Sequence, residues 1–106
     1  MHRDKGIALR LIDILVEEPT GAGMHRAELR QEFSETDLGA GLNTEDLWNL
    51  VDYHLRLLET AGFVKMTKDE DAAINTEFDY FEMTWAGHNY QEQNATAFIP
   101  EEILVG

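Results

Sequence analysis

The residue types that perform most enzyme chemistry are few in this chain. The 106 residues include no cysteine and a single serine, Ser34, which lies where a loop is expected. A hydroxyl or thiol nucleophile needs a base within hydrogen-bond reach to activate it, and no such partner is indicated here. Neighbouring acids such as Glu17 and Glu18 belong to ordinary charge runs and do not resemble a catalytic pair. We therefore expect no enzyme.

Histidine is the remaining residue type with metal or acid–base chemistry. The four histidines are His2, His25, His54 and His88. None stands in an HxH or HxxxH spacing, and none pairs with a carboxylate on one helix face in the way zinc and iron sites require. We expect no metal and no cofactor. For His54 we expect a polar position on a helix surface or at the edge of the core.

The charge balance is strongly acidic. Eight Lys and Arg against 21 Asp and Glu give 8 − 21 = −13 at pH 7. Such a surface repels phosphate at long range and favours cationic partners. It also serves solubility, so the acidity alone does not require a partner. Charge therefore disfavours nucleic acid and leaves a protein with a basic surface as the preferred partner.

Length and composition indicate one small domain in a reducing compartment. A chain of this size supports one modest core. The lack of cysteine gives no support for an oxidising compartment, and no stretch approaches the ~20 apolar residues of a membrane span. We expect a cytoplasmic protein with no membrane association. We divide it into a folded domain at 1–94 and a tail at 95–106.

The best-marked element is a long amphipathic helix that begins at Asn43 or Thr44. Either residue can cap it, and acids follow in the first turn, where the helix dipole favours negative charge. Apolar side chains then recur at helical spacing for about four turns. Gly62 stands where a C-cap glycine is common. The stripe consists of Leu47, Leu50, Val51, Leu55, Leu58 and Ala61.

The rest of the chain surrounds this helix with shorter elements. Apolar spacing predicts helices at about 3–18, 24–33 and 85–94, the last capped by Thr84, and a connecting loop at 34–42. Alternation predicts strands at 63–67 and 77–83, joined by an acidic loop at 68–76. The predicted fold is mainly α with a small antiparallel β-hairpin. It is a winged helix (winged helix-turn-helix) with a two-stranded wing and an extra C-terminal helix.

The end of the long helix resembles a known regulator class. Residues 53–64 read YHLRLLETAGFV, which is similar to the HLxxLxxAGLV run of arsenic-sensor-type bacterial repressors. Residues 83–87, MTWAG, resemble the LTxxG step that follows the wing in several winged-helix regulator families. Both resemblances imply a winged-helix fold without implying a ligand or a reaction.

A broader resemblance covers most of the chain. Residues 1–4 (MHRD), 53–62 (YHLRLLETAG) and 84–88 (TWAGH) are similar, in order, to the conserved blocks of domain-of-unknown-function family 2513. That family consists of small bacterial, phage and prophage proteins. Ala86 replaces the usual glutamate of the last block, and the acidic loop at 68–76 is long. The resemblance implies a mobile-element setting but carries no activity.

The resemblance to the arsenic sensors implies where a partner is contacted. The expected contact residues on the solvent face of the long helix are Trp48, Asn49, Asp52, Tyr53 and Arg56. Those of the wing are Lys65, Lys68, Asp69, Glu70 and Asp71. Asn49 can bond adenine and Arg56 guanine or phosphate. Glu45, Asp46, Asp52 and Glu59 oppose a phosphate backbone on the same helix.

The aromatic side chains separate into core candidates and one open case. We expect Phe63, Phe78, Tyr80, Phe81 and Trp85 to pack the hairpin against the helices. Trp48 is either the edge of the core or an exposed interface anchor. The apolar tail either folds back or joins a second copy, and we predict a homodimer, which is common for this architecture.

These observations favour a non-enzymatic acidic winged-helix regulatory or adaptor protein of phage or prophage type. It would act through protein–protein contacts, in one form by imitating DNA and occupying a basic cleft. The first alternative is a DNA-binding transcriptional regulator. The second is a small metalloprotein or hydrolase.

Overall fold

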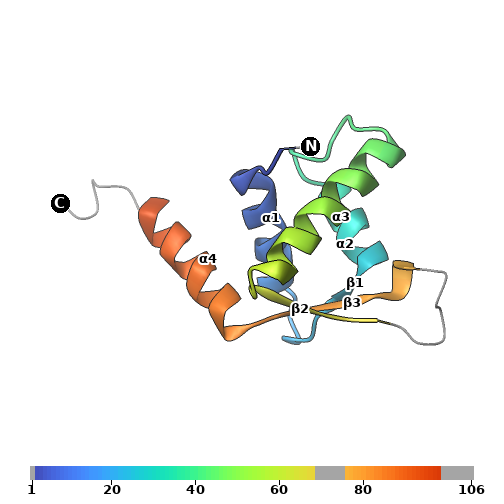
Figure 1. The fold of residues 1–106 in the computed structure, drawn as a ribbon. Helices are drawn as coiled ribbons and strands as arrows, with labels where there is room; N and C mark the ends of the chain where they lie inside the picture. The colour runs from blue at the N-terminus through green and yellow to red at the C-terminus, as the bar shows by residue number, and fades with distance from the viewer. Residues whose placement is uncertain (1, 69–75, 99–106) are drawn as a thin grey trace.

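The computed structural model describes residues 2–68 and 76–98, and Figure 1 shows their arrangement. The protein is mainly helical with a small antiparallel sheet, as predicted. In chain order the elements are α1 (Lys5–Val16), β1 (Met24–His25), α2 (Arg26–Ser34), α3 (Thr44–Thr60), β2 (Val64–Thr67), the short 3-10 helix η2 (Thr76–Phe78), β3 (Tyr80–Met83) and α4 (Trp85–Phe98).

The two main helices begin and end at residues suited to those positions. The Asp4 carboxylate accepts the N–H of Gly6 at 2.8 Å and of Ile7 at 3.2 Å, which caps α1. The Asn43 side chain accepts the Asp46 N–H at 2.8 Å and caps α3. Gly62 has a φ of 82°, a left-handed conformation that glycine adopts without steric cost, and it turns the chain out of α3. The predicted cap and glycine stop of the long helix are therefore confirmed.

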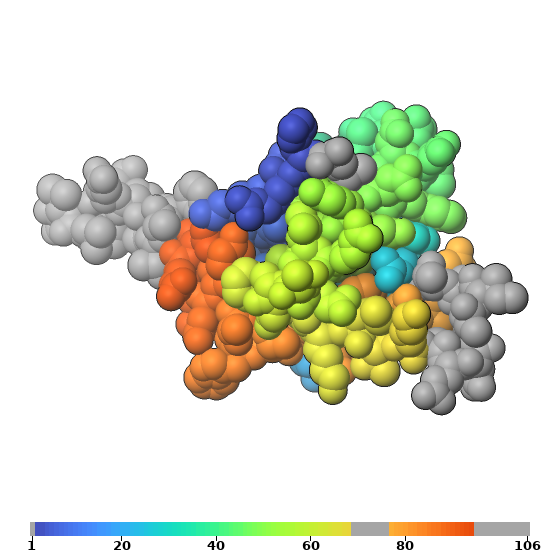
Figure 2. Space-filling view, viewed as in Figure 1, coloured from blue at the N-terminus to red at the C-terminus, as the bar shows by residue number. Residues whose placement is uncertain are grey.

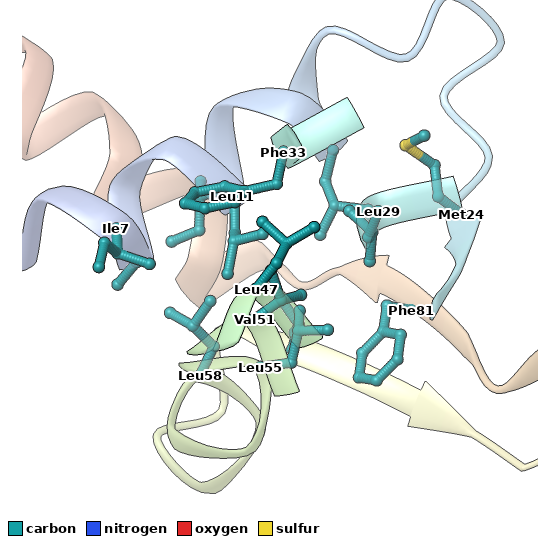
Figure 3. Packing of buried hydrophobic residues seen from close by; sticks show 14 residues of the cluster. Ile7, Leu11, Met24, Leu29, Phe33, Leu47, Val51, Leu55, Leu58 and Phe81 are labelled. Atoms are coloured by element: carbon teal, nitrogen blue, oxygen red, sulfur yellow. The ribbon is translucent and has the colours of Figure 1, made fainter. Parts of the chain in front are cut away.

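The core lies where α1, α2 and α3 pack on one another and on one face of the sheet (Figure 3). Leu11, Phe33 and Leu55 come from the three helices and are fully buried. Phe81 closes the core from the central strand, at 1% exposure. At ~25 cal/mol per Å² of apolar surface, burial of such side chains is the main stabilising contribution. The predicted stripe of α3 is buried at Leu47, Val51, Leu55 and Leu58.

The sheet has three strands, so the prediction of a two-stranded hairpin was incomplete. The strand order is β1-β3-β2, with both pairs antiparallel. Met24 pairs with Phe81, whereas Val64 pairs with Met83. Residues 24–25 had been assigned to the start of the second helix. Two residues are too few to show an alternating pattern, and this strand exists because β3 offers it a partner.

The last helix leaves the body of the molecule at the junction of α3 and β2. The Thr84 hydroxyl accepts the Gly87 N–H at 3.0 Å and donates to the Gly62 carbonyl at 2.6 Å. Gly87 lies so close to Phe63 that a Cβ there would be 2.0 Å from the Phe63 carbonyl oxygen. Figure 1 shows α4 leading away from the sheet, and its Gln91 donates to the Asp13 carboxylate of α1 at 3.4 Å. It begins at Trp85, as predicted, and continues past residue 94, where the predicted domain boundary stays a prediction.

Three side chains lie elsewhere than predicted. Trp85 was expected in the core but is 83% exposed as the first residue of α4. Phe78, also expected in the core, is 47% exposed in η2. His54 was expected at a helix surface or core edge, yet it is fully buried between its two hydrogen-bond partners. Among residues 2–68 and 76–98, no helix is long and apolar enough to cross a membrane.

Candidate functional site

A groove lies between α3 and the sheet, with a cavity volume of about 350 Å³. Asn49, Asp52, Tyr53 and Arg56 line it from one face of α3, because residues three or four apart on a helix share a side. Phe81 of β3 is among the residues on its sheet side. In Figure 2 the hairpin lies directly beside α3 on the visible face. Four of the five helix residues predicted to contact a partner are therefore brought together in one groove.

The carboxylate of Asp52 is held by two arginines of α2. Arg30 binds it as a fork, with Nε to Oδ1 at 3.1 Å and Nη2 to Oδ2 at 2.6 Å. Arg26 adds an ion pair to Oδ1 at 3.2 Å. A two-pronged guanidinium–carboxylate pair is among the strongest polar contacts in proteins. Asp52 thus compensates the charges of two arginines of its own protein, although its side chain is still 34% exposed.

Arg26 extends the same network to the sheet. Its Nη2 lies 3.1 Å from the Asp79 carboxylate, which is nearly buried just before β3. Its guanidinium carbon lies 5.0 Å from the centre of the Phe81 ring. One side chain of α2 therefore joins α3 to the central strand. This fixes the orientation of the groove walls.

Trp48 lies outside this groove, and its position was left open by the sequence. It is 40% exposed, and the Arg30 guanidinium carbon is 4.4 Å from its ring centre. It lines a neighbouring depression of about 360 Å³ between α2 and α3, together with Leu42 and Leu47. Trp48 is therefore a half-exposed aromatic fixed by a cation–π contact. The same arginine orients it and binds Asp52.

The remaining charged residues are the predicted contacts of the wing and the acids of α3 that were expected to oppose a phosphate backbone. Lys65 and Lys68 are exposed on and just after β2, and Lys65 pairs in register with Glu82. Glu59 lines the groove near Arg56, whereas Glu45 and Asp46 lie exposed in the first turn of α3. The predicted wing residues Asp69, Glu70 and Asp71 lie outside the described residues.

Sequence reasoning missed the arginines and Asp79. Arg26 and Arg30 lie one helical turn apart on α2, which places both on the same face. That spacing was a visible signal of a shared partner. The identity of the partner was not visible, because Asp52 is 22 residues away from Arg30 on a different helix.

Metal chemistry gains no support from the described part of the chain. Within residues 2–68 and 76–98, no group of three His, Asp or Glu side chains is arranged to hold a metal ion. His54, the most buried histidine, uses both ring nitrogens for hydrogen bonds. Its Nε2 accepts the Asp4 N–H at 2.9 Å, and its Nδ1 lies 2.8 Å from the Leu50 carbonyl oxygen.

Comparison with known proteins gives one informative similarity. No family model and no curated protein matches the chain, so the resemblance to family 2513 stays a prediction. The chain is similar to the crystal structure of a proposed transcriptional regulator from Thermoplasma acidophilum. The TM-score is 0.61 and the identity 21%, over 93% of this chain and 85% of the other. The two proteins share a fold.

Proposed function

We propose that the protein is a DNA-binding transcriptional regulator of the winged-helix type. In this proposal α3 enters the major groove and the β2–β3 hairpin is the wing that lies beside it. The observation that carries the proposal is the pairing of the Asp52 carboxylate with two arginines. This carboxylate is one of two acids of α3 that line the groove, the other being Glu59, and its charge is compensated by Arg26 and Arg30.

The side chains left on that face are suited to reading bases. Asn49 can form a two-bond contact with adenine, and Arg56 a two-bond contact with guanine. Tyr53 lies between them in sequence and lines the same groove. The shared fold with a proposed transcriptional regulator supports the same role. These contacts, and not bulk charge, would supply the specificity.

Binding selected DNA is the direct test of this function. Duplexes that bind the protein are selected from a random pool at low ionic strength. The dissociation constant of the enriched duplex is then measured by fluorescence anisotropy. We expect Arg56→Ala to weaken binding by about tenfold, since a base-reading pair contributes ~1–3 kcal/mol.

Arg10→Ala is the charge-matched control for Arg56→Ala. Arg10 lies in α1 and pairs with Asp37, 3.3 Å away on the surface, so its loss removes one positive charge without touching the α3 groove. We expect it to change the dissociation constant by less than about twofold, in line with the small contribution of exposed ion pairs. Equal weakening by both substitutions would contradict recognition by α3.

Charge favours a second candidate function, the acidic adaptor that binds a protein. The net charge of −13 and the exposed Glu45 and Asp46 at the start of α3 suit a partner with a basic surface. Trp48, at 40% exposure, is the anchor such an interface would use. The partner is then a protein, either through an ordinary interface or through imitation of DNA.

The same selection separates the two candidates. If no duplex sequence is enriched, and random duplex DNA shows no mobility shift with the protein at low salt, the adaptor is favoured and the regulator is excluded. Under the adaptor proposal, Trp48→Ala weakens capture of a basic partner, whereas Arg56→Ala leaves it unchanged.

A further inference from the structure

A second cavity lies on a different part of the molecule from the α3 groove. It has a volume of about 370 Å³ and lies between the start of α1, the end of α3 and the middle of α4. Figure 2 shows these three elements meeting on the visible face, in dark blue, yellow-green and orange. Pockets of this size are typical of sites for small molecules.

The walls of this cavity are mainly apolar. Leu57 and Ala61 contribute from α3, and Phe63 follows where the chain turns into β2. Tyr90 of α4 stacks on Phe63, with ring centres 4.4 Å apart and planes 14° from parallel. These two rings form a flat apolar wall. A ligand with an apolar body can therefore be buried here with a gain in free energy.

The polar part of the lining is cationic. Arg3 and Lys5 line the cavity, and among the residues that the structure describes no carboxylate does. Asp4, between them in sequence, directs its carboxylate to the N–H groups of Gly6 and Ile7. By contrast, the α3 groove includes Asp52 and Glu59, and the depression beside Trp48 includes Glu77. In a chain with a net charge of −13, an apolar cavity with two cations and no acid is an unusual local environment.

We propose that this cavity binds a small amphipathic anion, with an apolar body against Phe63 and Tyr90 and one carboxylate-type head group at Arg3 and Lys5. The inference does not depend on DNA binding, because it concerns a different surface. The cavity walls join α4 to the last turn of α3. A bound molecule would therefore hold α4 against the helix that forms the proposed DNA interface.

Three probes with the same apolar chain test the proposal on the unmodified protein. Octanoate, 1-octanol and octylammonium differ only in the charge of the head group. We expect calorimetric titration to give the tightest dissociation constant for octanoate, about fivefold below that of octanol, as an exposed ion pair contributes up to ~1 kcal/mol. Octylammonium should bind most weakly. Amide chemical shifts of Ala61, Phe63 and Tyr90 should change on titration.

Substitutions locate the two halves of the site. Arg3→Gln with Lys5→Gln should raise the octanoate dissociation constant to that of octanol, and Lys65→Gln, an exposed cation outside the cavity lining, should leave it unchanged. Ala61→Trp places a large ring at an exposed position of the cavity and should abolish binding of all three probes.

Several results would overturn the proposal. One is an equal dissociation constant for octanoate and octanol. Another is a set of amide chemical-shift changes centred away from the cavity. A dimer that octanoate dissociates in sedimentation velocity would assign the cavity to a second copy. If Leu104→Asp in the tail at 95–106 increased the affinity for octanoate, the occupant of the cavity would be the chain's own tail.

Discussion

At the scale of single residues, the polar side chains of α3 have different roles on its two sides. Asp52 faces α2 and binds Arg30, whose side chain is almost completely buried. His54 faces the start of α1 and accepts the Asp4 N–H. Both residues position other elements against α3. Asn49, Tyr53 and Arg56 line the groove beside Asp52, together with the acidic Glu59.

Removing the Asp52 carboxylate should destabilise the fold. Asp52→Ala leaves Arg30 buried without its fork partner, which is costly because the remaining charge has lost its compensation. Asp52 is itself 34% exposed, so solvent screens part of this interaction, and we expect a loss of about 2 kcal/mol in the free energy of unfolding. Urea denaturation measures it.

Asp37→Ala is the matched control for Asp52→Ala. Asp37 also pairs with an arginine, but its side chain is 78% exposed, so we expect a loss below about 0.5 kcal/mol. If the two substitutions cost the same, the α2–α3 network does not stabilise the protein as described.

Replacing His54 should also destabilise the protein. His54→Leu keeps the volume roughly but removes both ring hydrogen bonds, and it leaves the Asp4 N–H without its acceptor. We expect a loss of about 2 kcal/mol, the typical cost of an unsatisfied buried group. Thermal and urea unfolding measure it, with His88→Leu on the exposed face of α4 as the control. A neutral His54→Leu would show that this contact contributes nothing.

At the scale of elements, the sequence was informative where a pattern is long and local. The leucine stripe of α3 spans several turns, so its capping, length and buried face could be predicted. Strand β1 has two residues and depends on Phe81 and Tyr80, which lie more than 50 positions later. Trp85 was misplaced because a large apolar side chain next to a hairpin usually packs inward. Its actual direction depends on how Thr84 turns the chain into α4.

The three stretches at 1–4, 53–62 and 84–88, on which the resemblance to family 2513 was predicted, contact one another in the structure. Asp4 of the first block donates its N–H to His54 of the second, and Thr84 of the third bonds Gly62 of the second. In this protein those blocks hold α1, α3 and α4 together.

Gly87→Ala should weaken the attachment of α4. The added Cβ would lie 2.0 Å from the Phe63 carbonyl oxygen, a backbone atom that cannot move alone. We expect a loss of about 2 kcal/mol, as for other overpacked sites, and altered amide shifts at Phe63 and Tyr90. The control is Gly6→Ala in α1, where the nearest atom is the Asp4 carboxylate oxygen at 3.1 Å. Unchanged stability and shifts for Gly87→Ala would contradict this packing.

At the scale of the whole molecule, charge limits how DNA can be bound. Of the eight Lys and Arg residues, Arg10, Arg26 and Arg30 form ion pairs within the described part of the chain. The cations on the side of α3 and the hairpin are then Arg56, Lys65 and Lys68. A complex with so few phosphate contacts must obtain much of its affinity from contacts with bases.

The dissociation constant should therefore depend weakly on salt. With Arg56 on a base and phosphate contacts from Lys65 and Lys68, the logarithm of the binding constant should fall with the logarithm of salt concentration with a slope of about −2. Measurement of the selected duplex between about 50 and 200 mM salt gives this slope. A slope steeper than about −4 would mean phosphate contacts beyond those of Lys65 and Lys68, even in a homodimer. The predicted homodimer would double the number of contacts, and sedimentation velocity measures that state directly.

The joint at Thr84 also has a mechanical consequence. Its hydroxyl bonds the residue that ends α3 and the first turn of α4, so the two helices meet at one side chain. Helix α4 is about 21 Å long at 1.5 Å per residue. A tilt of about 10° at this joint would move the far end by about 4 Å over that length. Because Gln91 of α4 also donates to the Asp13 carboxylate of α1 at 3.4 Å, a small rotation at the end of α3 would be transmitted along α4 to α1.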